Sequence, residues 1–196
     1  MHGRLSALLI AAVAIAALAS CGDPTALEAR FDNREAEFSV HALNGAHPNT
    51  FNAVRVRTIG LERADSRFAF DVAFDLTDTG TVKLITARAM GTEIAATNNR
   101  VGLRDSPGLT FEQVTTNPPR DLFVFDSVLV VPVGRLVLID VLDLGCATES
   151  IIGFNIRAKL RIDSIVPAER LIYMRMVSNP NCGFRDLIPG GQRPED

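Results

Sequence analysis

The sequence is poor in the residues that most often build enzyme and nucleic-acid sites. Its 196 residues include no tryptophan, one tyrosine, three histidines and three cysteines. The lack of tryptophan excludes a sugar-binding platform built on that side chain. Acidic residues outnumber basic ones by 23 to 20, so the basic excess typical of nucleic-acid-binding proteins is missing. We therefore expect no nucleic-acid partner.

The common catalytic and nucleotide-binding motifs are missing from the sequence as well. The chain contains no G-x-S-x-G, no Walker loop and no GxGxxG. His41 and His47 flank the Leu43-Asn44-Gly45 turn, but a zinc site needs three or four ligands. Exposed or half-buried histidines near a hairpin are the simpler interpretation. We expect no catalytic residues, no metal and no cofactor, and we interpret the protein as non-enzymatic.

The first twenty residues differ in character from the rest of the chain. Arg4 carries the only formal charge, and residues 5–19 read LSALLIAAVAIAALA. A charged start followed by an apolar run of this length is typical of a secretory signal peptide. The run is shorter than the ~20 residues that a membrane-spanning helix needs. We therefore predict a cleaved leader over residues 1–20 rather than a spanning anchor.

The leader ends in Leu18-Ala19-Ser20-Cys21, which resembles the lipobox of bacterial lipoproteins. The resemblance implies cleavage before Cys21 and a diacylglyceryl thioether on its sulfur, so that lipidated Cys21 anchors the chain to a membrane of the cell envelope. Gly22 is compatible in that family with transfer to the outer membrane, on its periplasmic face or at the cell surface. The runs AKLRID and NPNCGFRDL, farther along the chain, are similar to envelope lipoproteins with no known activity. The resemblance therefore implies a location in the cell envelope, but it identifies no functional site.

Two further cysteines, Cys146 and Cys182, are separated by 36 residues. Export would deliver them to an oxidising compartment, where disulfides persist. We predict one disulfide between them, with two free buried thiols as the alternative, since no CxxC spacing points to a metal. Closing this loop would stabilise the fold by about 4 kcal/mol in the chain-entropy model.

A period of two in hydrophobicity dominates the mature chain and predicts strands with one apolar face. The positions that alternate in this way are Phe68, Phe70, Val72, Phe74 and Leu76, and later Ile156, Ala158, Leu160 and Ile162. Residues 54–56 and 171–177 predict further strands. The denser runs 122–131 and 136–142, separated by Pro132-Val133-Gly134, predict a buried hairpin.

Turn-forming residues separate these runs. Asp78-Thr79-Gly80, Pro167-Ala168-Glu169 and Asn179-Pro180-Asn181 predict tight returns. Residues 87–120 are loop-like, although Thr110 and Gln113 fit a capping box for a short helix, which we expect across an open end of the β structure.

The whole pattern predicts an all-β protein. We expect an antiparallel β-sandwich or a small β-barrel of about eight strands, with one or two short helices. The predicted organisation is a signal peptide at 1–20, a lipidated tether at 21–35, a single β domain at 36–188 and a disordered tail at 189–196.

Charged residues between the apolar positions predict solvated sheet faces. Asp71 and Asp75 should share a strand face about 13 Å apart, too far for a pair of catalytic carboxylates. The residues 75–80 lack the alternating acids of a calcium loop. Five outward basic residues would form a positive ladder for lipopolysaccharide phosphates or an acidic partner if their strands adjoin. These are Arg55, Arg57, Arg157, Lys159 and Arg161. Surface pairing with Asp71, Asp75 or Asp163 is the simpler interpretation.

Three functional hypotheses remain open from the sequence, and the third is an enzyme whose site is assembled from scattered residues. The first is an envelope lipoprotein whose β domain is a non-enzymatic interaction or structural module for another envelope protein or an anionic surface polymer. The second is a carrier for a small apolar ligand, a lipid or metabolite, with residues 122–142 and Phe68, Phe70 and Phe74 lining a cavity. The same residues would equally fill a solid core.

Overall fold

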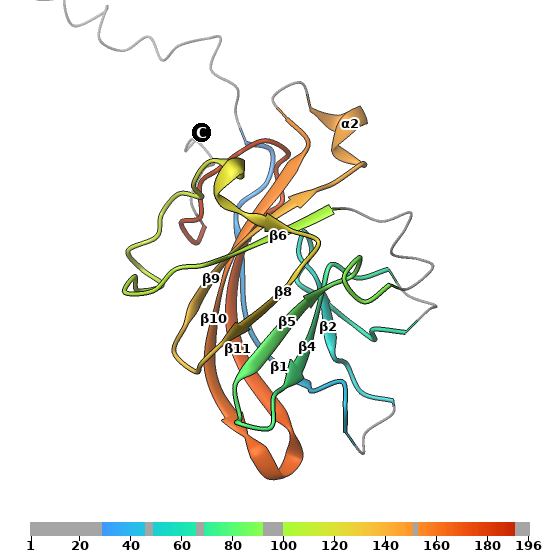
Figure 1. Cartoon of the computed structure of the whole chain (residues 1–196). Helices are drawn as coiled ribbons and strands as arrows, with labels where there is room; N and C mark the ends of the chain where they lie inside the picture. Colours follow the sequence, from blue (N-terminus) through green and yellow to red (C-terminus); the bar gives the residue numbers. More distant parts are fainter. Residues whose placement is uncertain (1–28, 46–48, 66–68, 92–99, 151–152, 191–196) are drawn as a thin grey trace, which may run out of the picture.

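The computed structural model describes residues 29–45, 49–65, 69–91, 100–150 and 153–190. Cys21 and the leader lie outside the described residues, as do His47 and Phe68. The described residues form eleven strands in two antiparallel sheets of six and five strands. The sheets face each other as two layers (Figure 1). This confirms the all-β class and makes the fold a β-sandwich.

The six-stranded sheet has the order β1-β11-β10-β9-β6-β7. Its strands are β1 (Arg34–His41), β11 (Leu171–Asn179), β10 (Asn155–Val166), β9 (Leu136–Leu142), β6 (Arg100–Asp105) and β7 (Val124–Phe125). The first strand, β1, pairs with the last, β11, with Arg34 opposite Ser178.

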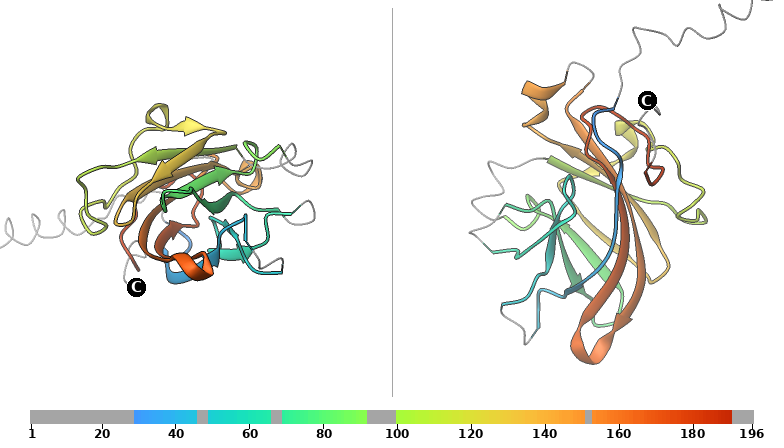
Figure 2. Two further views of the ribbon diagram at one scale, coloured as in Figure 1. Left: turned by 60° about the horizontal axis from the view of Figure 1, so that its bottom comes forward. Right: turned by 180° about the vertical axis from the view of Figure 1, so that it is seen from behind.

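The five-stranded sheet has the order β3-β2-β4-β5-β8. Its strands are β3 (Gly60–Glu62), β2 (Ala53–Arg55), β4 (Val72–Leu76), β5 (Val82–Thr86) and β8 (Val128–Val131). Three short helical elements complete the described chain: η2 (Arg120–Leu122), α2 (Cys146–Glu149) and η3 (Pro167–Glu169). Figure 2 shows α2 at one end of the sandwich and the β10–β11 hairpin, closed by η3, at the other.

The core between the sheets is built by the predicted alternation. Ile156, Ala158, Leu160 and Ile162 of β10 all lie in it, and so do Val72, Phe74 and Leu76 of β4. Phe70 belongs instead to a separate small cluster with Ala53, Ala73 and Ala87. The hairpins predicted at Asp78-Thr79-Gly80 and at η3 are confirmed, because β4 pairs with β5 and β10 with β11.

The predicted hairpin over residues 122–142 is wrong. β8 pairs with β5 in one sheet, whereas β9 pairs with β6 and β10 in the other. The turn at Pro132-Val133-Gly134 therefore carries the chain across the sandwich, with Gly134 at a φ of 81°. β9 is buried as predicted, but β8 is an edge strand and half of its residues are exposed. Periodicity shows that a strand is apolar without showing which sheet it joins.

The loop predicted over residues 87–120 contains a strand, β6, which lies between β9 and the terminal strand β7 of the six-stranded sheet. Gly102 and three charged residues obscure the apolar alternation of this strand. The capping box forms around a turn rather than a helix: the Thr110 N–H donates to Gln113 Oε1 (2.8 Å) and the Gln113 N–H to Thr110 Oγ1 (3.3 Å). This turn does not cover an open end. It lies on the outer face of the six-stranded sheet, where Phe111 packs with Leu138.

The predicted solvated face of β10 is also wrong, because this turn covers it. Lys159 is 1% exposed. Its Nζ donates to the carbonyl oxygens of Phe111 (2.7 Å) and Val114 (2.8 Å) and lies 4.4 Å from the centroid of the Phe111 ring. Burial lowers the pKa of Lys159 below its ordinary value. The ammonium is thus an internal fastener between β10 and the covering turn.

Asp71 and Asp75 are buried rather than solvated. Asp71 Oδ2 accepts a hydrogen bond from the Val56 N–H at 2.8 Å. Asp75 accepts from Asn44 Nδ2 at 2.8 Å and pairs with Arg170 at 3.0 Å. Neighbouring loops close over the strand face that the alternation had assigned to solvent.

The domain begins before the predicted boundary at residue 36. Ala29 is buried, and β1 starts at Arg34. The N–H groups of Arg30 and Phe31 both donate to Asn181 Oδ1, at 2.8 and 3.0 Å. Residues 29–35, predicted as tether, are therefore attached to the sandwich, whereas most of the predicted tail, residues 191–196, lies outside the described residues.

The two lysines of the chain offer a matched test of the internal fastener. Lys159→Met should lower the free energy of unfolding by about 2 kcal/mol, because two carbonyls lose a charged donor while relief of ammonium burial offsets part of the loss. Lys83→Met, at a half-exposed site on β5, should change it by less than about 0.5 kcal/mol. Urea unfolding of both variants measures the difference. Equal effects of the two substitutions would contradict the assigned role of Lys159.

Candidate interaction surface

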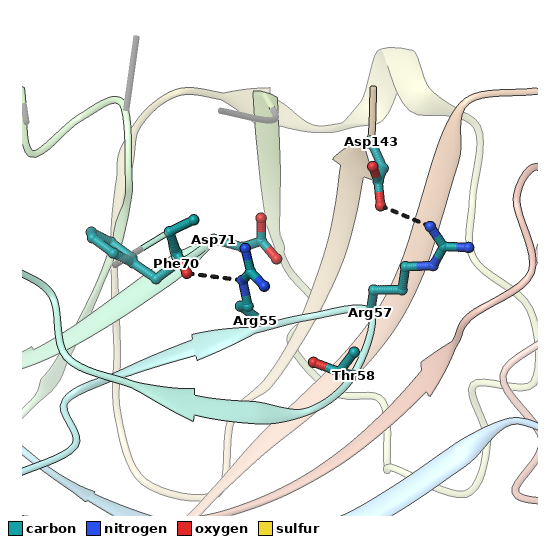
Figure 3. A pocket seen from close by; sticks show the side chains of 7 residues that line it. Arg55, Arg57, Thr58, Phe70, Asp71 and Asp143 are labelled. Atoms are coloured by element: carbon teal, nitrogen blue, oxygen red, sulfur yellow. Dashed lines mark hydrogen bonds and ion pairs between the residues drawn. The ribbon is translucent and has the colours of Figure 1, made fainter. Parts of the chain in front are cut away.

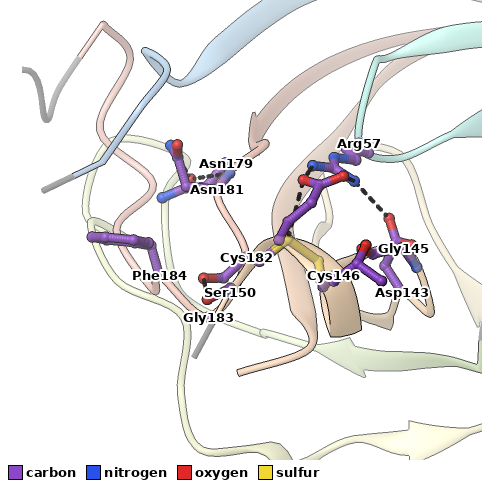
Figure 4. The surroundings of a disulfide bond; sticks show 12 residues. Arg57, Asp143, Gly145, Cys146, Ser150, Asn179, Asn181, Cys182, Gly183 and Phe184 are labelled. Atoms are coloured by element: carbon purple, nitrogen blue, oxygen red, sulfur yellow. Dashed lines mark hydrogen bonds and ion pairs between the residues drawn. A yellow bond between two sulfur atoms is a disulfide. The ribbon is translucent and has the colours of Figure 1, made fainter. Parts of the chain in front are cut away.

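A disulfide joins Cys146 of α2 to Cys182 after β11, with the two Cα atoms 5.5 Å apart (Figure 4). This confirms the predicted pairing. Both cysteines are buried, and the Ser150 hydroxyl donates to the Cys182 carbonyl at 3.1 Å. Asn181, which precedes Cys182, binds the backbone of the entering chain at Phe31. The disulfide therefore fixes the end of the sandwich at which the described chain begins.

Arg57 forms an ion-pair cluster beside this disulfide. Its guanidinium pairs with Glu149 of α2 and, at 3.5 Å, with Asp143. The hydrogen bond to Glu149 raises the pKa of Arg57 and lowers that of Glu149. All three side chains are partly exposed, so the cluster orients α2 more than it stabilises the fold.

A small polar pocket of about 250 Å³ lies next to Arg57 (Figure 3). Arg55, Thr58, Asp71 and Asp143 are among the residues that line it. Arg55 Nε donates to the Ala69 carbonyl at 2.9 Å. The pocket is smaller than the ~300–1,000 Å³ of typical sites for drug-sized ligands. Its two arginines are partly occupied by the protein itself, so it is a weak candidate for a ligand site.

The predicted positive ladder does not form. Arg55 and Arg57 belong with the five-stranded sheet, whereas Arg157, Lys159 and Arg161 lie on β10 of the other sheet. Arg161 does pair with Asp163, at 2.6 Å, along the same strand rather than across strands.

Arg157 is buried against the C-terminal loop. Its Nη1 donates to the carbonyls of Gly183 (2.9 Å) and Phe184 (3.0 Å), and its Nε lies 3.4 Å from Asp140. Burial raises the pKa of Asp140 and lowers that of Arg157. This pair attaches the C-terminal loop to β10, so Arg157 does not contribute to a cationic surface.

His41 ends β1 with its Nδ1 3.2 Å from the Glu169 carbonyl oxygen. Its predicted neighbour His47 lies outside the described residues. Within the described part of the chain, no group of three His, Cys, Asp or Glu side chains is placed to hold a metal ion. No helix there is long and apolar enough to cross a membrane.

The most distinctive surface is formed by residues 122–133, which we name the valine edge. This segment contributes β7 and β8, the terminal strands of the two sheets. Its exposed apolar side chains are Leu122, Val124, Val128, Val130 and Val133. Val124 is 65% exposed, and Val128 and Val130 are 51% and 50% exposed. Ser127 Oγ donates to the Val124 carbonyl at 3.2 Å, which keeps the two strands close together.

The opposite edges of the sandwich are protected in a way that the valine edge is not. β1 exposes Arg34, Glu35 and Glu37, and β3 is only three residues long and ends in Glu62. Charge and shortness are the usual means by which proteins prevent unwanted strand pairing. β8 has the sequence VLVV and, among the described strands, pairs with β5 alone. Its free edge is thus open and uncharged.

The sequence shows that this segment is apolar, but it does not show that its side chains are exposed. Residues 122–131 are apolar enough to be interpreted as a central strand, and only the turn at Pro132-Val133-Gly134 hinted that the two runs separate. Comparisons with protein-family models, with curated proteins and with solved structures found no match to this chain.

Loss of the disulfide should destabilise the sandwich without unfolding its core. The double variant Cys146→Ser, Cys182→Ser should lose about 2–4 kcal/mol of unfolding free energy, because the 36-residue loop is no longer closed in the unfolded chain. Thermal unfolding with and without a reductant is the measurement. The reductant should reproduce this loss in the wild type and have no effect on the variant; a wild type indifferent to reductant would contradict the prediction.

Proposed function

We propose that the protein is a lipid-anchored lipoprotein of the bacterial cell envelope, and that its β-sandwich binds an extended segment of another envelope protein along the valine edge. The leader and the pattern Leu18-Ala19-Ser20-Cys21 support the anchor. The disulfide suits an oxidising compartment. The observation that carries the binding proposal is the open, uncharged, valine-rich edge of β8.

An added strand would continue the five-stranded sheet beyond β8. In such β-augmentation, main-chain hydrogen bonds supply affinity and alternate side chains supply specificity. Val128 and Val130 lie on the same face of β8, opposite Ile85 and Lys83 of β5. The alternate side chains of an added strand would cover both valines, which a single domain otherwise leaves in water.

The chemistry of the valine edge favours a protein partner over a polysaccharide. A polysaccharide requires hydroxyl, amide or charged groups, whereas the exposed side chains here are aliphatic. Lys83 lies beside Val130, and Arg120 lies over the Phe125 ring at 4.6 Å from its centroid. Asp121 and Asp126 belong to or adjoin the same segment, so the border of the edge carries charges of both signs. We therefore expect a partner strand with apolar residues at alternate positions.

The anchor is tested on the full-length chain expressed in a Gram-negative host. The wild type should sediment with membranes, and its N-terminal peptide should begin at Cys21 with the added mass of the acyl groups. Cys21→Ser should carry no lipid, because serine cannot form the thioether. Ser20→Ala, which keeps a small residue before the cysteine, is the matched control and should behave as the wild type. An unmodified Cys21 in the wild type would contradict the proposal.

The binding surface is tested by photo-cross-linking in whole cells. A photoreactive residue at position 128 should give a protein adduct of defined mass, whereas one at the exposed position 173 should not. Adding Val130→Lys should reduce the adduct at least about tenfold, because a charge then faces the apolar partner strand at a cost above ~1.4 kcal/mol. Glu37→Gln, which changes the charge by one unit on the opposite edge, should leave the adduct unchanged.

Three outcomes of this experiment would overturn the binding proposal. The first is an adduct that survives Val130→Lys at full yield. The second is an adduct to lipid or polysaccharide alone, and the third is no adduct at position 128. Val130 is half-exposed, so Val130→Lys should still melt cooperatively, and a melting curve separates lost binding from lost folding.

A further inference from the structure

A second group of exposed apolar side chains gathers at the end of the sandwich where the described chain begins. Phe31, Leu144, Phe154 and Ile188 are between 46% and 62% exposed. They come from four separate segments: the entering chain, the turn before α2, the chain before β10 and the C-terminal loop. Figure 2 shows these segments at the end of the molecule opposite the β10–β11 hairpin.

Hydrogen bonds hold these four segments together. Asn181 Nδ2 donates to the Phe31 carbonyl at 2.7 Å, and Asn33 Nδ2 donates to the Ile188 carbonyl at 2.8 Å. The Asp143 N–H donates to the Phe154 carbonyl at 2.8 Å, next to Leu144.

The disulfide adds a covalent link between Cys146 of α2, which follows Leu144, and Cys182, which precedes the C-terminal loop that carries Ile188. The apolar end, which we define as Phe31, Leu144, Phe154 and Ile188, is therefore built on a fixed frame.

The position of the apolar end relative to Cys21 identifies what it faces. Seven residues lie between Cys21 and Ala29, so the two Cα atoms are eight steps apart and at most about 29 Å from each other in a fully extended chain. The 12 residues of β10 alone extend for roughly 40 Å along the sandwich. A lipid on Cys21 therefore keeps the apolar end closer to the bilayer than the length of the domain, with the β10–β11 hairpin at the far end.

We propose that the apolar end lies on the surface of the bilayer that holds Cys21, with its four side chains in the headgroup region. The inference rests on the proposed lipid anchor and adds an orientation to it. Arg30 and Arg185 lie near this end, but so do Asp32 and Glu149, so charge does not select a lipid surface by itself. Apolar contact supplies the attachment, as it does for interfacial segments that bury one apolar face.

In this orientation the long strands run roughly perpendicular to the membrane, and the free edge of β8 lies on the side of the domain. Figure 1 shows β8 on the flank of the sandwich, between the two ends. The valine edge then faces along the membrane plane, where another envelope protein lies within reach. The two apolar surfaces of the molecule thus have different occupants, lipid at the end and protein on the flank.

The absence of tryptophan from the chain allows a direct test with single reporters. Phe31→Trp, Leu144→Trp and Phe154→Trp place one indole each at the apolar end, and Tyr173→Trp places one on β11 near the far end. Each full-length, lipidated variant is reconstituted into vesicles of phosphatidylethanolamine and phosphatidylglycerol, with or without brominated acyl chains. Side chains that enter an interface by ~5–10 Å come within contact range of the bromines.

The expected result is a loss of roughly half the emission at the three end positions and little change at position 173, because only the end is at interfacial depth. Equal, unquenched emission at positions 154 and 173, in protein that is lipidated and floats with the vesicles, would overturn the proposal. Emission that depends on protein concentration and not on bromine would also overturn it, in favour of a second copy of the chain at this end. Far-UV circular dichroism confirms that each variant is folded.

Failure of the anchor itself would be visible separately. Protein whose N-terminal peptide lacks the lipid mass, and which does not float with vesicles, contradicts the proposed lipoprotein. Lipidated, floating protein with unquenched tryptophans contradicts only the proposed orientation.

Discussion

The buried ammonium of Lys159 organises one whole face of the sandwich. Two backbone carbonyls and an aromatic ring of the turn at residues 111–114 surround it, so the turn cannot leave the sheet without exposing unpaired groups. Arg161 and Arg175 also lie over the Phe111 ring. Because a loop covers this face, residues 156–160 of β10 are buried on both faces of the strand. The loop also leaves the flanking segment 122–133 as the surface where the two sheets end.

The distribution of charge separates structural from interactive surfaces. Buried charges are matched within the protein: Asp75 by Arg170, Arg157 by Asp140 and two carbonyls, Lys159 by the covering turn. Edges β1 and β3 are protected by surface charge or by short length. The valine edge and the apolar end depart from both patterns, because each exposes several aliphatic or aromatic side chains, and only Asp126 among residues 122–133 is charged. Binding is expected at surfaces that expose apolar side chains in this way.

Sequence periodicity predicts the core face of strands whose two faces differ in polarity. It does not predict exposure where distant parts of the chain cover a strand. The alternation at β4 and β10 identified their core faces, and the cysteine pair was assigned from its number and compartment. Lys159 and Asp71 were misplaced because loops distant in sequence cover them. β6 is not evident from the sequence because only Val101 and Leu103 mark its core face. Gly102 lies on the opposite face, where a Cβ would lie 2.9 Å from Phe123 and Phe125, so close packing requires glycine. The composition of β8 does not show that it is an edge strand, because its position depends on the order of strands in the sheet.

The pairing of β1 with β11 has a consequence for the order in which the protein is made. Among the described strands, the ribosome makes β1 first and β11 last, and β1 has no other partner. The six-stranded sheet therefore cannot close until nearly the entire chain is available, and contacts between such distant residues form slowly. Cys182 also emerges late, so its disulfide seals the sandwich near the end of folding. The pairing of β1 is thus one of the last steps in forming the six-stranded sheet.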